Sequence, residues 1–161
     1  MTSGASSWSF TEKDFGAITE SLERFLLTSN TRCALLVDRA GQLVATVGEQ
    51  PDFDPTAFAT LTAADFSAND QLARLVGEKD FSSLVHQGEN ESMVLADISR
   101  RVILVALFDK RTTLGLVRLK IKDTVVELSV LFDGMFARSA SAAQQPSILA
   151  GADDEIDKLF E

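Results

Sequence analysis

The chain has 161 residues, of which 45% are hydrophobic and 24% charged, and its formal net charge at pH 7 is −9. This length suits one domain with a tail, and the acidic charge argues against binding to a nucleic-acid backbone. No apolar run approaches the roughly 18 residues that a membrane-spanning helix needs, and no signal-peptide pattern is present. The single cysteine, Cys33, cannot form an internal disulfide, so we expect a cytoplasmic protein.

Residues 1–10 are small and polar apart from Trp8 and Phe10, and we expect them to form a flexible lead-in. Thr11 has the character of an N-cap, because its hydroxyl can accept a backbone N–H and acids follow it in the first turn. Apolar residues then recur at helical spacing: Phe15, Ile18, Leu22, Phe25 and Leu26. The pattern predicts a first helix that ends at Ser29-Asn30.

A β-hairpin is predicted next, from two short apolar runs over residues 34–37 and 43–47. The connection between them contains Gly41, which can adopt a positive φ. A second helix should begin after Asp54, a capping residue followed by proline, and end near Gly77.

The second helix carries two kinds of surface. Its apolar stripe consists of Phe58, Leu61, Leu72 and Leu75. Small or short polar side chains occupy another face: Ala57, Thr60, Ala64, Ser67, Ala68 and Gln71. Small side chains let another backbone approach closely, so this face is a candidate docking surface. An alanine-rich surface without a partner is the alternative, and the pattern alone does not distinguish the two.

Three strands are predicted after this helix, over residues 81–86, 93–98 and 102–108. The last is apolar at every position, which is typical of a central strand covered on both faces. A third helix is indicated by apolar residues three and four apart: Leu114, Val117, Ile121, Val125, Leu128, Phe132 and Met135. Residues 139–152, rich in Ala, Ser and Gln and containing Pro146, are predicted to form a linker.

These elements predict an α+β domain over residues 11–138 with the order α-ββ-α-βββ-α. Short connections imply a five-stranded, mostly antiparallel sheet in a three-layer arrangement, with the first and third helices on one face and the second on the other. A single helix cannot cover five strands, so apolar surface should remain for a second copy of the chain. We therefore expect a homodimer.

The sequence offers few residues for catalysis or ligand binding. His86 is the only histidine and lies in a strand pattern, which favours an ordinary sheet residue over a general base. Cys33 opens an apolar strand and fits a small core residue. Neither a GxxxxGK[ST] phosphate loop nor calcium-loop spacing is present. We predict no catalytic residue, no metal and no cofactor, and Arg111 is either a turn residue or an arginine finger for a partner's phosphate.

The last nine residues, 153–161, form a separate acidic segment with five acids and one lysine, a net charge of −4. A short helix here would gather Ile156, Leu159 and Phe160 on one face, opposite the acids. Such a short helix is not stable alone in water and commonly folds into the groove of a partner. A solubilising end without a partner is the alternative.

Three stretches make the chain resemble the roadblock/LC7 family: LLVDRAGQLVATVG in the hairpin, LTAADFSANDQLARLVGE in the second helix, and RVILVALFDKRTTLGLVRLKIK from the last strand into the third helix. With the closing DDEIDKLFE, they are most similar to its bacterial MglB-type branch, over about residues 11–138 and the last nine. The resemblance implies a homodimer whose paired second helices form a platform for one GTP-bound Ras-like GTPase of MglA type.

The resemblance also implies an activity: activation of GTP hydrolysis, with an effect on nucleotide exchange, in the control of cell polarity or motility. Proteins of this branch position the GTPase's own catalytic residues and donate no arginine finger. The implied partner-binding residues are Thr60, Ala64, Ser67, Ala68, Gln71, Ile156, Leu159 and Phe160. Ser67 and Gln71 stand where smaller Ala and Gly would be expected.

Two other functions remain open at this point. A non-catalytic roadblock scaffold would only bring partners together. A small-ligand sensor of similar architecture would need a polar-lined pocket, and few convergent polar residues are present to line one.

Overall fold

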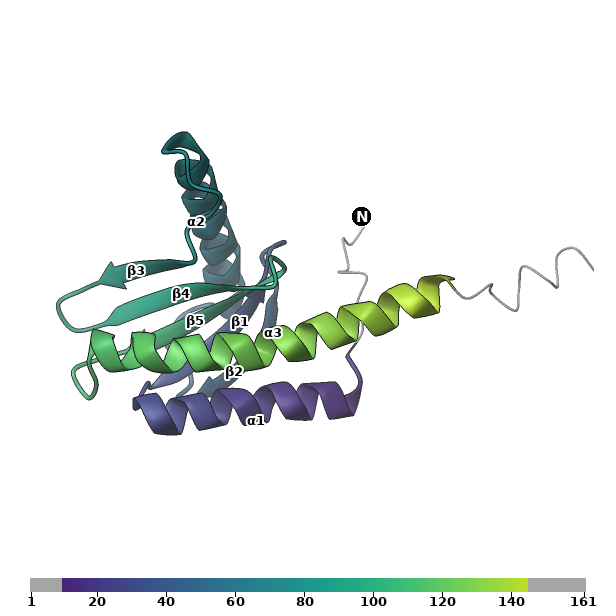
Figure 1. Ribbon diagram of the computed structural model, residues 1–161. Helices are drawn as coiled ribbons and strands as arrows, with labels where there is room; N and C mark the ends of the chain where they lie inside the picture. The colour runs from purple at the N-terminus through teal and green to yellow at the C-terminus, as the bar shows by residue number, and fades with distance from the viewer. Residues whose placement is uncertain (1–9, 145–161) are drawn as a thin grey trace, which may run out of the picture.

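The computed structural model describes residues 10–144, and the order of the elements is the predicted one (Figure 1). The helices are α1 (Glu12–Ser29), α2 (Pro55–Leu75) and α3 (Leu114–Gln144). The strands are β1 (Cys33–Asp38), β2 (Leu43–Gly48), β3 (Ser83–Gln87), β4 (Ser92–Ile98) and β5 (Val102–Phe108).

The five strands form one sheet in the order β2-β1-β5-β4-β3, and each neighbouring pair is antiparallel. β5 lies at the centre, as its continuous apolar sequence predicted. β4 and β5 are joined by a tight turn in which Ser99 and Arg100 both have positive φ, 52° and 58°. Three residues separate the paired Ile98 and Val102, and the Arg101 N–H donates to the Ile98 carbonyl at 3.1 Å.

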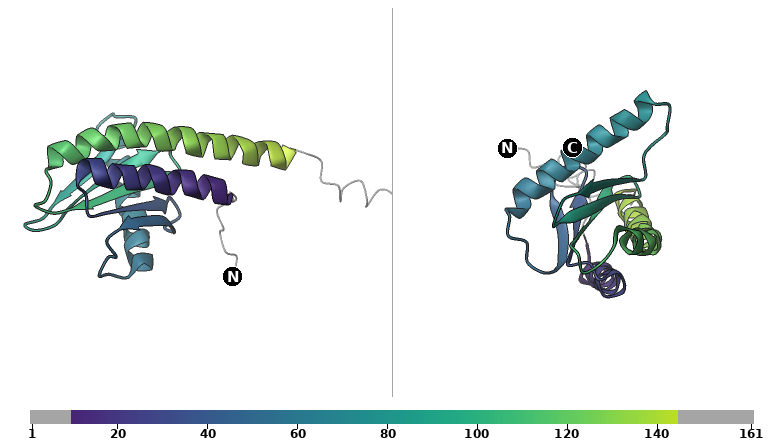
Figure 2. Two further views of the ribbon diagram at one scale, coloured as in Figure 1. Left: turned by 90° about the horizontal axis from the view of Figure 1, so that it is seen from below. Right: turned by 90° about the vertical axis from the view of Figure 1, so that its left-hand side faces the viewer.

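The helices close the two faces of the sheet, so the predicted three layers are confirmed. α1 and α3 run side by side on one face, and α2 crosses the other face (Figures 1 and 2). Along β1, the side chains of Ala34 and Leu36 pack with α1 and α3, whereas those of Leu35 and Val37 pack against α2. Every residue of β1 is buried because both of its faces are covered.

α1 begins with the predicted cap. The Thr11 side chain accepts a hydrogen bond from the Asp14 backbone N–H at 3.1 Å, and Asp14 accepts one from the Thr11 N–H at 3.2 Å. Arg138 of α3 donates to Asp14 at 2.6 Å and thereby lowers the pKa of that carboxyl. The predicted helical stripe lies within α1; Phe15 at its start is 47% exposed, while Ile18 and the rest of the stripe after it face the core.

Both ends of the described chain differ from the sequence interpretation. Phe10 was assigned to the lead-in, yet its ring packs edge-on against Phe132 of α3, with centroids 6.1 Å apart. α3 continues to Gln144, so residues 139–144 are helical where a linker was predicted. Their alanines favour a helix.

Phe66 on α2 provides a test of how this helix is seated. Its side chain is fully buried against the sheet, so Phe66→Ala should lower the free energy of unfolding by about 3–5 kcal/mol. Leu27→Ala is the control, because Leu27 is 85% exposed on α1 and its loss should cost no more than about 0.5 kcal/mol. Urea unfolding followed by circular dichroism measures both. An equal loss of unfolding free energy in the two variants would contradict the packing of α2 on the sheet through Phe66.

Candidate functional site

The side of α2 that faces the sheet is built mainly from small residues. Ala59, Ala63 and Ala73 are buried there beside Phe66. Close packing is also enforced at the β1–β2 turn, where Gly41 has a φ of +90° and a Cβ would lie 3.2 Å from the Cα of Thr60. Small side chains therefore let α2 lie close to the hairpin.

The predicted apolar stripe of α2 does not form the core contact. Leu61, Leu72 and Leu75 are 70%, 56% and 82% exposed, and Phe58 alone is half-buried. The inward positions of this helix are taken by alanines, so its leucines are left on the surface. Sequence reasoning missed this arrangement because it assumes that large apolar side chains point inward.

The five predicted partner-binding residues of α2 do lie together on its outer surface. Thr60, Ala64, Ser67, Ala68 and Gln71 are all exposed. A shallow groove of about 500 Å³ runs along this surface and is lined by Ala64, Ser67, Ala68, Gln71, Leu72 and Leu75. We call the five residues from Thr60 to Gln71 the α2 platform. The other three predicted contacts, Ile156, Leu159 and Phe160, lie outside the described residues.

Arg39, in the β1–β2 turn, contacts the side of α2 that faces the sheet and connects the helix to β4. Its guanidinium donates to Asp70 of α2 at 2.7 Å and also forms an ion pair with Asp97 of β4. The same group lies 4.7 Å from the centroid of the Phe66 ring, within the range of a cation–π contact. Sequence reasoning treated Arg39 only as part of a turn, since its three partners are distant in the chain.

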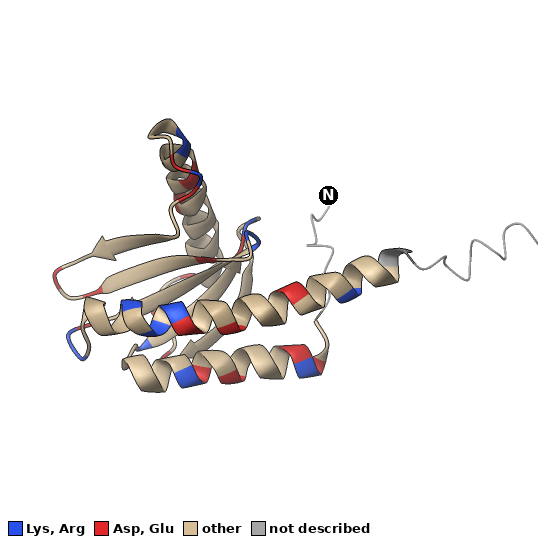
Figure 3. Cartoon of the chain, in the orientation of Figure 1, with Lys and Arg blue, Asp and Glu red and all other residues tan. Residues whose placement is uncertain are grey.

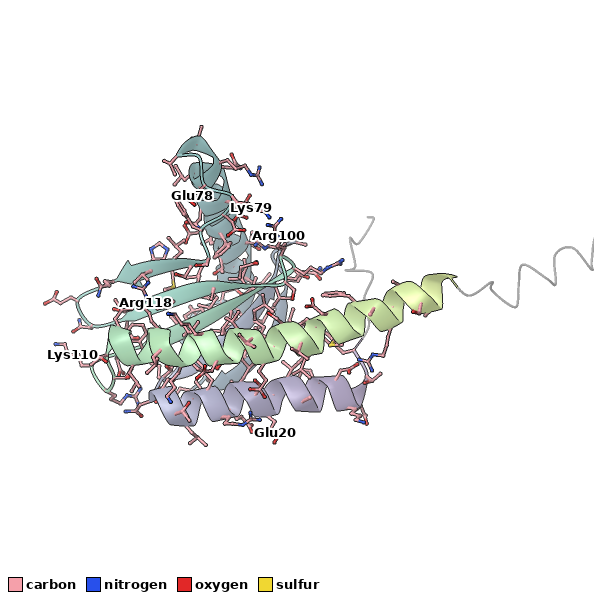
Figure 4. All side chains as sticks on the ribbon, viewed as in Figure 1. Glu20, Glu78, Lys79, Arg100, Lys110 and Arg118 are labelled. Carbon is pink, nitrogen blue, oxygen red and sulfur yellow. The ribbon has the colours of Figure 1, made fainter. Side chains whose placement is uncertain are left out.

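A charged cavity of about 430 Å³ adjoins the α2 platform. Its charged lining comes from Arg39, Asp70, Arg74, Lys79, Asp80, Asp97 and Arg100. Ser67 borders both this cavity and the groove. Lys79 and Arg100 lie near one another beside the end of α2 (Figure 4). The platform is therefore a surface of small side chains flanked on one side by charges of both signs.

The residues considered for chemistry are engaged elsewhere. Burial raises the pKa of the Cys33 thiol, which disfavours the reactive thiolate. His86 of β3 lies 2.6 Å from Asp65 of α2, with Nε2 facing a carboxylate oxygen. Arg111 donates to Asp109 at 2.9 Å and to Glu49 at 2.8 Å, and it lowers the pKa of both carboxyls.

Two further observations apply to residues 10–144. Within this part of the chain, no group of three or more His, Cys, Asp or Glu side chains could hold a metal ion. None of the described helices is long and apolar enough to cross a membrane.

The family profile and three similar solved structures point to one family. The Roadblock/LC7 domain profile matches residues 17–108. The structure is similar to Myxococcus xanthus MglB, with 38% identity, a TM-score of 0.71, and coverage of 74% of this chain and 98% of that chain. It is also similar to the gliding protein MglB from Thermus thermophilus, with 31% identity, a TM-score of 0.72, and coverage of 78% of this chain and 95% of that chain.

A third structure, described as MglB with tetrameric arrangement, is 30% identical with a TM-score of 0.74 and coverage of 80% of this chain and 97% of that chain. A search of the curated proteins found no match.

The Arg39 contacts lead to a prediction about how α2 is held. Arg39→Met should lower the free energy of unfolding by about 1–3 kcal/mol, because two carboxylates lose their cation. Asp70 and Asp97 are 24% and 22% exposed, which keeps the cost below that of a fully buried pair. Urea unfolding measures the change, and amide hydrogen exchange should quicken in the second half of α2.

Arg100→Met is the matched control. Arg100 pairs with Asp80 at 3.2 Å, but its side chain is 66% exposed, so its loss should cost less than about 1 kcal/mol. If Arg39→Met lost no more unfolding free energy than this control, Arg39 would not be the residue that holds α2 in place.

Proposed function

Since the chain belongs to the roadblock/LC7 family, we propose that it is a cytoplasmic regulator that stimulates GTP hydrolysis by a Ras-like small GTPase of MglA type, in the control of cell polarity or motility. The observation that carries the proposal is the exposed α2 platform in a chain 38% identical to Myxococcus xanthus MglB over 98% of that protein. The platform offers a surface and no chemistry of its own, as befits a regulator of another protein's reaction.

The α2 platform would act by close contact with the switch segments of the GTP-bound partner. Ala64 and Ala68 let a backbone approach the helix, while the Ser67 hydroxyl and the Gln71 amide can hydrogen-bond with it. When a switch segment is ordered in this way, the GTPase's own water-positioning residue can orient the attacking water, and the GTPase hydrolyses GTP faster. Arg111 supplies no arginine finger in this scheme, because Asp109 and Glu49 already hold its guanidinium.

The exposed leucines of α2 support self-association. Leu72, Leu75 and Val76 lie at the end of α2 that projects beyond the sheet on the side of β3 (Figure 1). β3 is an edge strand with one hydrogen-bonded neighbour, so its outer side can pair with another strand. A homodimer joined along β3 would continue the sheet and bring two α2 helices together. The tetrameric arrangement described for one similar MglB supports this proposal.

The acidic segment 153–161 would provide a second contact with the GTPase. Its apolar residues Ile156, Leu159 and Phe160 can fold onto a groove of the partner, with the acids facing solvent. Deleting residues 153–161 should therefore weaken GTPase binding, or alter nucleotide exchange, and leave the fold intact.

A single-turnover assay tests the proposed activity. The purified chain is mixed with the GTP-loaded Ras-like GTPase of the same organism, and phosphate release is followed. We expect faster release, and we expect Ser67→Arg to reduce the acceleration at least about tenfold, because an arginine would obstruct the centre of the platform. Ala137→Arg is the matched control, since Ala137 is also an exposed helical residue but lies on α3.

The result separates the activator from its alternative. Binding without faster phosphate release would replace the proposed activity by that of a non-catalytic scaffold. An unchanged rate with Ser67→Arg, in a chain that does accelerate hydrolysis, would remove the platform from the mechanism.

The homodimer is tested by size-exclusion chromatography with light scattering. We expect the mass of two chains at micromolar concentration, and Leu72→Glu should shift the mass toward one chain by burying an unpaired charge. Leu119→Glu is a close control, because Leu72 and Leu119 are 56% and 58% exposed on different helices. A single-chain mass for the unaltered protein would refute the dimer.

A further inference from the structure

The face of the sheet that carries α1 and α3 is not covered completely. α1 lies over β1 and β2, and α3 lies over β4, which leaves open the space between α3 and β3. This space is a groove of about 330 Å³. Its apolar lining is provided by Val94, Ala96, Ile121, Val125 and Val126.

Two cations border this apolar groove. Arg118 and Lys122, one turn apart on α3, both line it, and no ion pair between described residues involves either of them. Lysine and arginine are concentrated on the first turns of α3 (Figure 3), and Arg118 lies on the side of that helix toward β4 (Figure 4). The lining also includes Ser82, Ser83 and Asp97, and the Asp97 carboxylate is paired with Arg39. Among the described residues, the groove therefore combines an apolar floor with two unpaired cations at its rim.

We propose that this groove binds the chain's own acidic segment, residues 153–161. The segment carries a net charge of −4 together with Ile156, Leu159 and Phe160, so it complements both the rim and the floor. Arg118 and Lys122 would pair with its acids while its apolar side chains cover Val125 and the neighbouring floor. No other part of the sequence combines five acids with three large apolar residues in nine positions.

The length of the chain after α3 fits this docking. Val126 precedes Gln144, the last residue of α3, by 18 positions, or about 27 Å along the helix. Residues 145–152 are eight in number and, when extended, span about 26–29 Å. The segment would thus reach the groove at Val126 and run antiparallel to α3. As a helix it would be about 13 Å long, close to the roughly 12 Å between Arg118 and Val126.

The docking takes place in the chain alone, so it goes beyond the proposed regulation of a GTPase and does not depend on it. It also gives the segment two competing sites. While it lies in the groove, Leu159 and Phe160 are buried against α3 and β3 and are not available to a partner.

Disulfide trapping in the full-length chain tests the docking. In a Cys33→Ser background, Asp153→Cys is combined with Val126→Cys, because the docked segment places residue 153 beside Val126, and mild oxidation should link them within one chain. The product should have single-chain mobility in non-reducing electrophoresis, in a yield independent of protein concentration. The control joins Asp153→Cys with Leu27→Cys, which is 85% exposed on α1, and should give little product.

Charge reversal makes the test specific. Arg118→Glu with Lys122→Glu should lower the trapping rate about five- to tenfold through the loss of two exposed ion pairs, and Asp157→Lys with Glu161→Lys in the same chain should restore it, because these two acids lie opposite Lys122 and Arg118 in the docked segment. Products linked only between two chains, equal trapping with the Leu27 control, or no response to charge reversal would each overturn the proposal. Thermal unfolding of every variant checks that the fold is retained.

Discussion

Burial of the two central strands on both faces is the constraint on which the rest of the structure depends. β1 is buried from Cys33 to Asp38, and β5 is buried at every position except the half-buried Leu107. Alternate side chains of each strand point into opposite layers. Neither layer can be omitted without exposing a row of large apolar side chains to water, so α1 and α3 on one face and α2 on the other are equally necessary.

The way in which α2 satisfies this constraint also determines its outer surface. The helix lies close to the hairpin because alanines and one phenylalanine face inward, and Gly41 leaves room for Thr60. Its leucines are consequently exposed to water. In an isolated chain their apolar surface gains no free energy of burial. Exposed leucines beside a surface of small side chains are typical of a helix that makes contacts outside its own domain, so the packing of the core and the proposed interactions have a common origin.

The sequence predicted those features whose signals are local. Thr11 and Asp54 mark helix starts through their own side chains, and the apolar run 102–108 placed β5 at the centre without reference to other elements. The orientation of α2 could not be predicted, because it depends on how closely the helix approaches β1. Arg39 was missed for the same reason: its partners Asp70 and Asp97 lie 31 and 58 positions away. The α2 platform residues were marked by a local signal, the small-residue face of the second helix, and the family resemblance then gave that face a role in binding a partner.

Incomplete coverage of the sheet concentrates the open surfaces at one edge. On one face the end of α2 projects past β3, and on the other the groove lies between β3 and α3. The two surfaces are separated by a single layer of strands, in which Val94 and Ala96 of β4 line the groove while Leu95 packs beneath α2. β4 therefore contributes side chains to both surfaces, although α2 itself makes its main sheet contacts with β1 and β2. The edge of the sheet is open on both faces for one reason: no element of the described chain lies beyond β3.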